Sequence, residues 1–395
     1  MDFSVMTPGE TLFGWGRLRE LPATVRRYGS RVAVARGGGH YDNFGLHALF
    51  AHHGITVVEL SPLSREPEPE DIDSASAIVR DAGVQAVLAI GGGSVIDLGK
   101  AVAALAAQHP MYPVRVYLED IGEGRVLERD PLPFIAVPTT AGTGSEATKN
   151  AVISSRREGF KKSLRDRRML ADVVIIDPEL TVALPAHLTA WTGMDALTQL
   201  IEAYTSCRAQ PVTDALALQG ISATHLLPQA VANGSNRAAR EEMALAAYLS
   251  GLCLANAGLG AAHGMAAALG SFSPIPHGLA CALALPWVMA ANLASVEARY
   301  ARVAEALTGE TYSSRQTAAC AAVRAVWELS RGIGIPRAVD VPALNGLLAD
   351  ELLPELARRC HGNSLRGNPR ELTDTELVTI FRAMRDFDTP LQYCS

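Results

Sequence analysis

The first half of the chain alternates short runs of β-branched and other apolar residues with stretches of helical periodicity. The runs typical of buried strands are 31–35, 56–60, 86–90, 134–137 and 173–177. Apolar residues recur at helical spacing over 72–81 and 95–107. This alternation predicts a parallel sheet with helices on both faces.

The pattern changes near Leu180, because strand-like runs disappear and Ala, Leu and Met dominate to the end. Helices are predicted, with Gly and Pro at the joins, over 194–205, 211–231, 238–257, 261–269, 277–293, 296–307, 314–332, 344–357 and 375–384. A chain of 395 residues exceeds the size at which one core stops growing. We therefore expect an α/β domain over 1–180 and an all-helical domain over 181–395.

Bulk composition excludes several classes of partner. The net charge is -6 and no Lys/Arg run stands out, which argues against nucleic acid. Hydrophobic residues make up 48%, but Gly, His, Pro or a charge interrupts each apolar stretch, so we expect no membrane span. The start, Met1-Asp2-Phe3-Ser4, lacks a signal segment, and we expect a cytoplasmic protein. The six cysteines form no C-x-x-C pair and are predicted to be reduced, mostly buried thiols.

A glycine-rich turn is the clearest local signal of the first half. In the run Gly91-Gly92-Gly93-Ser94-Val95-Ile96-Asp97 a strand ends in glycines and continues into a helix. Glycines let the backbone approach a pyrophosphate, and free N–H groups at the helix start hold the anion. The alternative is a tight strand-to-helix turn without a ligand, which glycine also suits.

A second loop, Pro138-Thr-Thr-Ala-Gly-Thr-Gly-Ser-Glu146, follows another predicted strand. The hydroxyls of Thr139, Thr140 and Thr143 can donate to phosphate oxygens or to a nicotinamide carboxamide, although a capped turn uses the same residues. Ligands bind at the carboxyl ends of strands in such sheets. Two such loops after two parallel strands therefore favour one shared ligand.

Polar side chains of the second half offer a metal site. Asp195 and Gln199 are four residues apart and share one face of a predicted helix. His263 and His277 lie on either side of a short segment rich in Gly, Ser and Pro. One carboxylate and two imidazoles from three segments suit a divalent metal. Taken singly, each His is more often a structural or surface residue.

Taken in order, the motifs GGGSVID, PTTAGTGSE, GMDALT, HGM and PHG resemble those of the iron-containing (group III) alcohol dehydrogenase family. The resemblance extends over most of the chain. It implies a dehydroquinate-synthase-like fold, with NAD(P) in a cleft between the domains and a divalent metal, Fe²⁺ or Zn²⁺, on the helical side. It also favours a homodimer.

Residue roles follow from the same resemblance. The cofactor-binding residues it implies are Gly91, Gly92, Gly93, Ser94, Thr139, Thr140 and Thr143. Further candidates for cofactor binding are Gly37 and Gly38, in a glycine run that lacks the third glycine of the dinucleotide fingerprint, and Asp97 of the GGGSVID motif. Asp195, His263 and His277 match three of the four metal ligands of the family. Asn150 and Lys162 match residues that line the cleft, and with His277 they are the candidate catalytic residues.

Two positions depart from the family pattern. The fourth ligand is usually a His four residues after the Asp, but here it is Gln199, a weaker oxygen donor. Many members carry a second His, thought to relay protons, where this chain has Ala267. Together the two departures predict an atypical member that holds its metal less tightly.

The reaction implied is hydride transfer between the nicotinamide C4 and a substrate carbonyl carbon, with the metal as Lewis acid. The chain is then an NAD(P)-dependent alcohol dehydrogenase or aldehyde reductase with a small alcohol or aldehyde as substrate. One alternative is a metal-independent reductase of the maleylacetate reductase type, which Gln199 keeps open. Others are a dehydroquinate-synthase-like lyase and a nucleotide-binding protein without turnover.

The end of the first predicted strand bears on the choice between NAD and NADP. NAD-preferring relatives carry there an Asp that hydrogen-bonds the ribose diol, whereas this chain has Arg36-Gly37-Gly38-Gly39. Gly37 leaves room for a 2′-phosphate and Arg36 can pair with it. We therefore expect NADPH to be accepted. A stronger expectation is that NADPH is preferred to NADH. The alternative is that Glu59 takes the acidic role.

Overall fold

The computed structural model describes residues 2–38, 45–155 and 157–393. Two compact units can be distinguished by their internal packing. The α/β unit comprises Met6–Thr140 and Ser145–Thr181, and the helical unit comprises Met1–Val5, Ala141–Gly144 and Val182–Ser395. The short segment Ala141–Gly144 thus belongs to the helical unit although it lies between two parts of the other.

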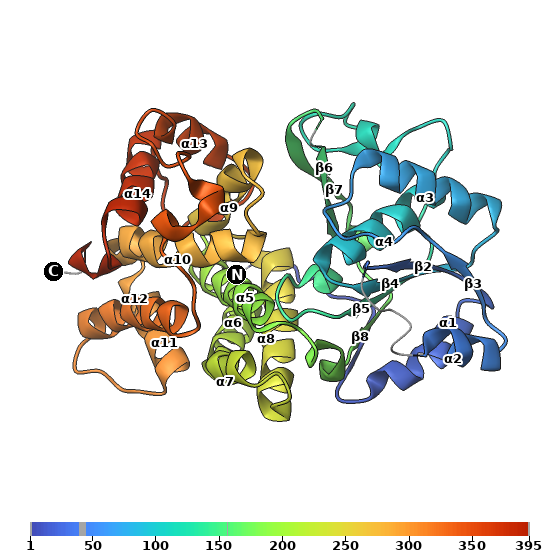
Figure 1. The fold of residues 1–395 in the computed structure, drawn as a ribbon, viewed down its shortest axis with the longest axis horizontal. Helices are drawn as coiled ribbons and strands as arrows, with labels where there is room; N and C mark the ends of the chain where they lie inside the picture. The colour runs from blue at the N-terminus through green and yellow to red at the C-terminus, as the bar shows by residue number, and fades with distance from the viewer. Residues whose placement is uncertain (1, 39–44, 156, 394–395) are drawn as a thin grey trace. The chain divides into compact units, whose positions relative to one another are not determined.

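A six-stranded parallel sheet forms the centre of the α/β unit (Figure 1). Its order is β1-β8-β5-β4-β2-β3, with β1 Glu10–Phe13, β2 Arg31–Arg36, β3 Thr56–Glu59, β4 Ala86–Gly91, β5 Phe134–Pro138 and β8 Val173–Ile176. The five strands expected from apolar runs are confirmed, as is the predicted fold class. The strand β1 was not predicted, because it is a half-buried edge strand and lacks a continuous apolar run.

Helices cover both faces of this sheet. Figure 1 shows α1 (Leu21–Arg26) and α2 (Leu46–His52) on one face and α3 (Pro69–Asp81) and α4 (Gly93–Ala106) on the other. The large buried side chains toward α1 and α2 alternate with small ones along the strands, as the two-residue period of a strand requires. Beneath α4, a Cβ added at Gly99 would lie 2.7 Å from Cβ of Ala89. Small residues therefore let α4 pack close to β4.

An antiparallel hairpin, β6 (Asn150–Ser155) and β7 (Phe160–Arg165), was not predicted. The strand β6 buries only alternate residues, and its apolar run is only three residues long, Ala151 to Ile153. Two buried residues of α4 hold it. Oδ2 of Asp97 accepts a hydrogen bond from the Val152 amide at 3.0 Å, and Nζ of Lys100 donates to the Asn150 carbonyl at 2.8 Å.

The helical unit is built from α5 Ala186–Thr205, α6 Pro211–Ala223, α7 Leu227–Ala232, α8 Arg237–Ala257, α9 Ala261–Phe272, α10 His277–Asn292, α11 Glu297–Thr308, α12 Arg315–Gly332, α13 Leu353–Cys360 and α14 Asp374–Asp386 (Figure 1). The predicted helices are confirmed with shifted ends. The helix expected over 211–231 is divided, with Pro228 in the first turn of α7. The helix expected over 344–357 starts only at Leu353, with Pro354 in its first turn. Proline suits a first turn because it has no N–H to donate within the helix.

Helix α10 corrects one expectation from the sequence. The run His277–Ser295 is long and apolar enough to cross a membrane, although no such stretch was expected. Most of it, 72%, is buried inside the protein, and α10 packs against α5, α9, α12 and α14. It is therefore a core helix.

Glycines bring the segment Ala141–Gly144 into backbone contact with α8. The backbone of Gly144 has φ +60, and a Cβ there would lie 2.4 Å from Cα of Gly251. A Cβ at Gly251 would in turn lie 2.3 Å from the Gly144 carbonyl oxygen. Neither position has room for a side chain, so the close approach requires glycine on both sides.

This packing predicts that Gly251→Ala lowers the free energy of unfolding by about 1–3 kcal/mol, because the added methyl group has to displace backbone. Gly270→Ala in α9 is the matched control, since no atom lies within 4 Å of the added Cβ. Helix propensity should make that control neutral or up to about 1 kcal/mol more stable. Thermal and urea unfolding measure both. Equal stability of the two variants would show that the contact is unimportant.

Candidate metal centre

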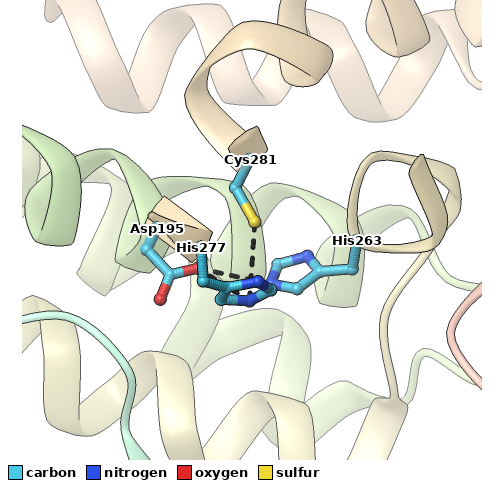
Figure 2. Close-up of side chains that lie close together, drawn as sticks. All are labelled: Asp195, His263, His277 and Cys281. Carbon is cyan, nitrogen blue, oxygen red and sulfur yellow. Dashed lines mark hydrogen bonds and ion pairs between the residues drawn. The ribbon is translucent and has the colours of Figure 1, made fainter. Parts of the chain in front are cut away.

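Three segments distant in sequence meet at one point of the helical unit (Figure 2). Asp195 lies on α5, His263 in the first turn of α9 and His277 at the first position of α10. Oδ1 of Asp195 lies 3.3 Å from Nε2 of His263 and 3.9 Å from Nε2 of His277. The predicted convergence of these three side chains is confirmed.

Cys281 completes the cluster and was not predicted. It follows His277 by one turn of α10, and its Sγ lies 3.7 Å from Nε2 of His277 (Figure 2). One ligand atom from each of the four residues lies within 4.8 Å of the others. The spacing of His277 and Cys281 places both on one helix face, and this signal was present in the sequence. A C-x-x-C pattern does not include it, because the partner of Cys281 is a histidine four residues earlier.

Two buried atoms at the centre of the cluster make no hydrogen bond within the described residues: Oδ1 of Asp195 and Nε2 of His263. Their side chains are only 2% and 5% exposed, whereas that of His277 is 37% exposed. A buried polar atom without a partner costs about 1–3 kcal/mol. An acceptor and a ring nitrogen that face each other in this way fit a cation between them.

Charges within the cluster shift its pKa values. Burial by itself disfavours the charged form of Asp195, but the two histidines more than offset this and lower the pKa of its carboxyl. Burial, reinforced by the charge of Asp195, raises the pKa of the Cys281 thiol to about 12. In the absence of a cation, the cluster therefore holds a carboxylate and a protonated thiol.

Glu202, which was also not predicted, orients His263. It lies seven residues after Asp195 on α5, hence on the same face. Its Oε2 bonds Nδ1 of His263 at 2.6 Å, and its Oε1 accepts from the Ala262 amide at 2.6 Å. One carboxylate thus satisfies the N-terminus of α9 and directs the other ring nitrogen of His263 toward Asp195. Metal-binding histidines are commonly held in this way.

The glycine of the PHG motif has a packing role. A Cβ at Gly278 would lie 2.4 Å from the Trp191 carbonyl oxygen and 3.4 Å from Cβ of Asp195. Only glycine lets the start of α10 approach α5 so closely. This approach brings His277 beside Asp195.

Gln199 lies one turn after Asp195, and its amide is bonded at both ends. Its Oε1 accepts from Oγ of Ser250 at 2.8 Å, and its Nε2 donates to the Thr143 carbonyl at 3.3 Å. The Asp–His–His set is intact without it. The description of the chain as atypical, based on Gln199 and Ala267, is therefore not supported.

Comparisons with known proteins agree with this geometry. Residues 8–178 match the model of iron-containing alcohol dehydrogenase, and residues 189–385 match the model of the C-terminal part of the Fe-containing alcohol dehydrogenase family. The chain belongs to the iron-containing alcohol dehydrogenase family. It is an oxidoreductase acting on CH–OH groups, and the family implies NAD(P) and a divalent metal.

Individual members of the iron-containing alcohol dehydrogenase family are similar to this chain over nearly its whole length. Long-chain-alcohol dehydrogenase 1 of Geobacillus thermodenitrificans is 38% identical over 392 residues, 96% of either chain. A 1,3-propanediol dehydrogenase of Citrobacter freundii is 38% identical over 96% of this chain and 98% of its own. A crystal structure of 1,3-propanediol oxidoreductase matches with a TM-score of 0.89 at 33% identity, covering 97% of this chain and 100% of that one.

In this alcohol dehydrogenase the glycine-rich turn and the start of the second predicted cofactor loop, up to Thr140, are adjacent in the α/β unit. The Thr139 amide donates to the Gly91 carbonyl at 2.9 Å, and a Cβ at Gly92 would lie 3.4 Å from Cγ2 of Thr140. Gly93 and Ser94 open α4, whose first turn has no side-chain cap. The loops thus share the carboxyl edge of β4 and β5. Thr143 belongs to the segment of the helical unit, where its carbonyl binds Gln199.

Other predicted site residues have contacts within the α/β unit. Asp97 is buried and bonds β6, which gives it a structural role; its part in cofactor binding stays a prediction. Nζ of Lys162 lies 2.8 Å from Oδ2 of Asp120. In the hairpin, Asn150 pairs with Arg165 and Lys162 with Ile153, so Asn150 and Lys162 lie on opposite faces. The hairpin does not bring these two side chains together.

The end of β2 lies at the edge of the described residues. Gly37 bridges to Leu63, and Gly38 is the last residue described before 39–44. Gly39 of the glycine run lies outside the described residues. Nε of Arg36 lies 3.1 Å from Oε2 of Glu59. Arg36, the candidate partner of a 2′-phosphate, and Glu59, the candidate partner of the ribose diol, therefore form an ion pair.

We predict that Glu202→Gln weakens divalent-metal binding about 10- to 100-fold, the usual cost of losing an outer carboxylate. The amide oxygen of glutamine can still accept a hydrogen bond from Nδ1 of His263, but it lacks the charge that makes the ring a better donor to the metal. Thr205→Val is the control, because the Thr205 hydroxyl is buried on the same helix but bonds only carbonyls of α5. Competition with a chromophoric chelator measures both affinities. Unchanged affinity in Glu202→Gln would exclude the orienting role.

Proposed function

We propose that this chain is an NAD(P)-dependent, metal-assisted alcohol dehydrogenase that interconverts a small alcohol and its aldehyde. The observation that supports the metal is the pair of buried atoms without hydrogen bonds, Oδ1 of Asp195 and Nε2 of His263, in a four-residue cluster. Such a pair is costly in an enzyme that works without a cation. The cluster therefore favours the metal-assisted reaction over the metal-independent reductase.

The residues of the chain would divide the work as follows. Asp195, His263 and His277 would hold the divalent ion. When bound, that ion supplies Lewis acidity toward the substrate oxygen, and the nicotinamide supplies or accepts the hydride. Glu202 keeps the ring of His263 in place, and the half-exposed flank of His277 is the side from which solvent and substrate reach the cluster.

Cofactor binding is assigned to the two adjacent loops. The backbone of Gly91, Gly92, Gly93 and Ser94 would contact the pyrophosphate at the open first turn of α4. Thr139 and Thr140 would contribute hydroxyls from the neighbouring loop. Asn150 and Lys162 are proposed as further polar residues near the substrate, although their opposite orientations make a joint role in one pocket difficult.

The first prediction of this proposal concerns the metal. Exhaustive chelation should abolish NADH- or NADPH-dependent reduction across a panel of small aldehydes, and added Zn²⁺ or Fe²⁺ should restore it. Asp195→Asn should lower kcat/KM at least about 100-fold, because its carboxylate is the anionic oxygen donor of the three residues proposed to hold the ion. Full activity after chelation would instead identify a metal-independent reductase. No turnover with any aldehyde would favour a lyase or a non-enzymatic role.

The second prediction concerns the cofactor. Two relatives are named for different cofactors. A methanol dehydrogenase of Bacillus methanolicus is named NAD-dependent, and a butanol dehydrogenase of Clostridium saccharobutylicum is named NADPH-dependent. Glu59 forms an ion pair with Arg36, which partly neutralises its carboxylate. We expect NADPH to be accepted and preferred.

The test compares kcat/KM for the two cofactors in the wild type and two variants. Arg36→Ala should reduce the NADPH/NADH ratio, since the cation that would pair with the 2′-phosphate is lost. Glu59→Gln should increase it, since a carboxylate repels that phosphate. A hundredfold preference of the wild type for NADH would contradict the proposal.

A further inference from the structure

We propose that Cys281 is the fourth protein ligand of the metal site. It would replace the histidine that the family pattern has at position 199. Its sulfur would make the site prefer Zn²⁺ to Fe²⁺. This inference rests on the metal-assisted function proposed above. Nothing in the family resemblance points to position 281.

The distances among the four donors fit a single ion. For bonds of about 2.0–2.1 Å to nitrogen and oxygen and about 2.3 Å to sulfur, tetrahedral donors lie roughly 3.3–3.6 Å apart. Three of the six separations are 3.3 Å between Asp195 and His263, 3.7 Å between His277 and Cys281, and 3.9 Å between Asp195 and His277, and all four donor atoms lie within 4.8 Å of one another. Small side-chain movements bring these atoms to ligand distances.

The surroundings of Cys281 favour ligation over an inert role. Its side chain is fully buried on α10 and points toward the rings of His263 and His277 (Figure 2). Cys253 on α8 is equally buried, but its Sγ contacts the Thr213 carbonyl at 3.5 Å and lies away from any group of metal-binding side chains found among the described residues. Cys253 is therefore a matched control for Cys281, because both thiols are buried in helices and only that of Cys281 lies beside the candidate metal ligands.

Gln199, by contrast, has its amide engaged. The hydroxyl of Ser250 binds its oxygen at 2.8 Å, and its nitrogen bonds the Thr143 carbonyl. Ligation by that oxygen would compete with the bond from Ser250. Gln199 therefore joins α5 to α8 and to the segment Ala141–Gly144, and the thiol supplies the donor that the missing imidazole would have given.

The donor set decides the choice of metal. One carboxylate oxygen, two imidazole nitrogens and one thiolate are all common zinc ligands, and zinc sites can expand to five donors during catalysis. Sites of mixed N, O and S donors bind Zn²⁺ more tightly than Fe²⁺, and a thiolate increases this difference. Ligation requires Cys281 to lose its proton to solvent when the metal binds.

Cobalt substitution tests the ligand directly. Wild type, Cys281→Ser, Cys253→Ser and Gln199→Ala are loaded with Co²⁺, and far-UV circular dichroism confirms that each is folded. The wild type, Cys253→Ser and Gln199→Ala should show the near-ultraviolet thiolate-to-Co²⁺ charge-transfer band together with visible d–d bands. Cys281→Ser should retain d–d bands but lose the charge-transfer band.

Zinc affinity provides the second readout. Cys281→Ser should lower it more than about 100-fold, whereas Gln199→Ala should change it much less, because the Gln199 amide bonds Ser250 and the Thr143 carbonyl. Wild type should also retain Zn²⁺ over Fe²⁺ in competition.

Three outcomes would overturn the inference. Bound Co²⁺ without a thiolate band in the wild type would exclude Cys281 as a ligand while leaving the proposed function intact. Loss of metal in Gln199→Ala but not in Cys281→Ser would assign the fourth position to the amide. Failure of every form to bind Co²⁺ or Zn²⁺ would overturn both this inference and the proposed metal-assisted function.

Discussion

A carboxylate and an imidazole that are buried together, Asp195 and His263, form the interaction on which the rest of the site depends. Neither Oδ1 of Asp195 nor Nε2 of His263 has a hydrogen bond among the described residues, although the two atoms lie 3.3 Å apart. Burying charges costs several kcal/mol per ion unless they are compensated. Glu202 adds a second buried carboxylate behind His263, so positive charge between the two carboxylates is favourable. Without a metal a protonated His263 supplies that charge, and a divalent cation between Asp195 and His263 would supply it in the proposed enzyme.

The fold positions these groups on helices rather than on mobile loops. Asp195 and Glu202 share a face of α5, His263 begins α9, and His277 and Cys281 occupy consecutive turns of α10. Close contacts at glycines, where a side chain would not fit, fix the distances between these helices. The contact of Gly278 with α5 is an example. A ligand set built on rigid, closely packed elements keeps its geometry when a cation binds, which favours tight and selective binding.

Much of this arrangement could be predicted from the sequence. Continuous apolar runs identified the inner strands, because parallel strands are buried on both faces. The edge strand β1 and the hairpin of β6 and β7 escaped because they bury only part of their residues. The convergence of Asp195 with two histidines followed from the order of motifs. Glu202 did not, since its role comes from a tertiary contact with α9 that a single sequence does not display, whereas Cys281 had a signal in its position one helical turn after His277.

The most direct test of the central claim is an anomalous difference map, recorded at the zinc absorption edge, from crystals of the protein purified with Zn²⁺. We expect one peak bonded to Oδ1 of Asp195 and to Nε2 of both His263 and His277, at about 2.0–2.2 Å. A peak elsewhere, or a water molecule bridging Asp195 and His263 with no metal between them at saturating Zn²⁺, would contradict it.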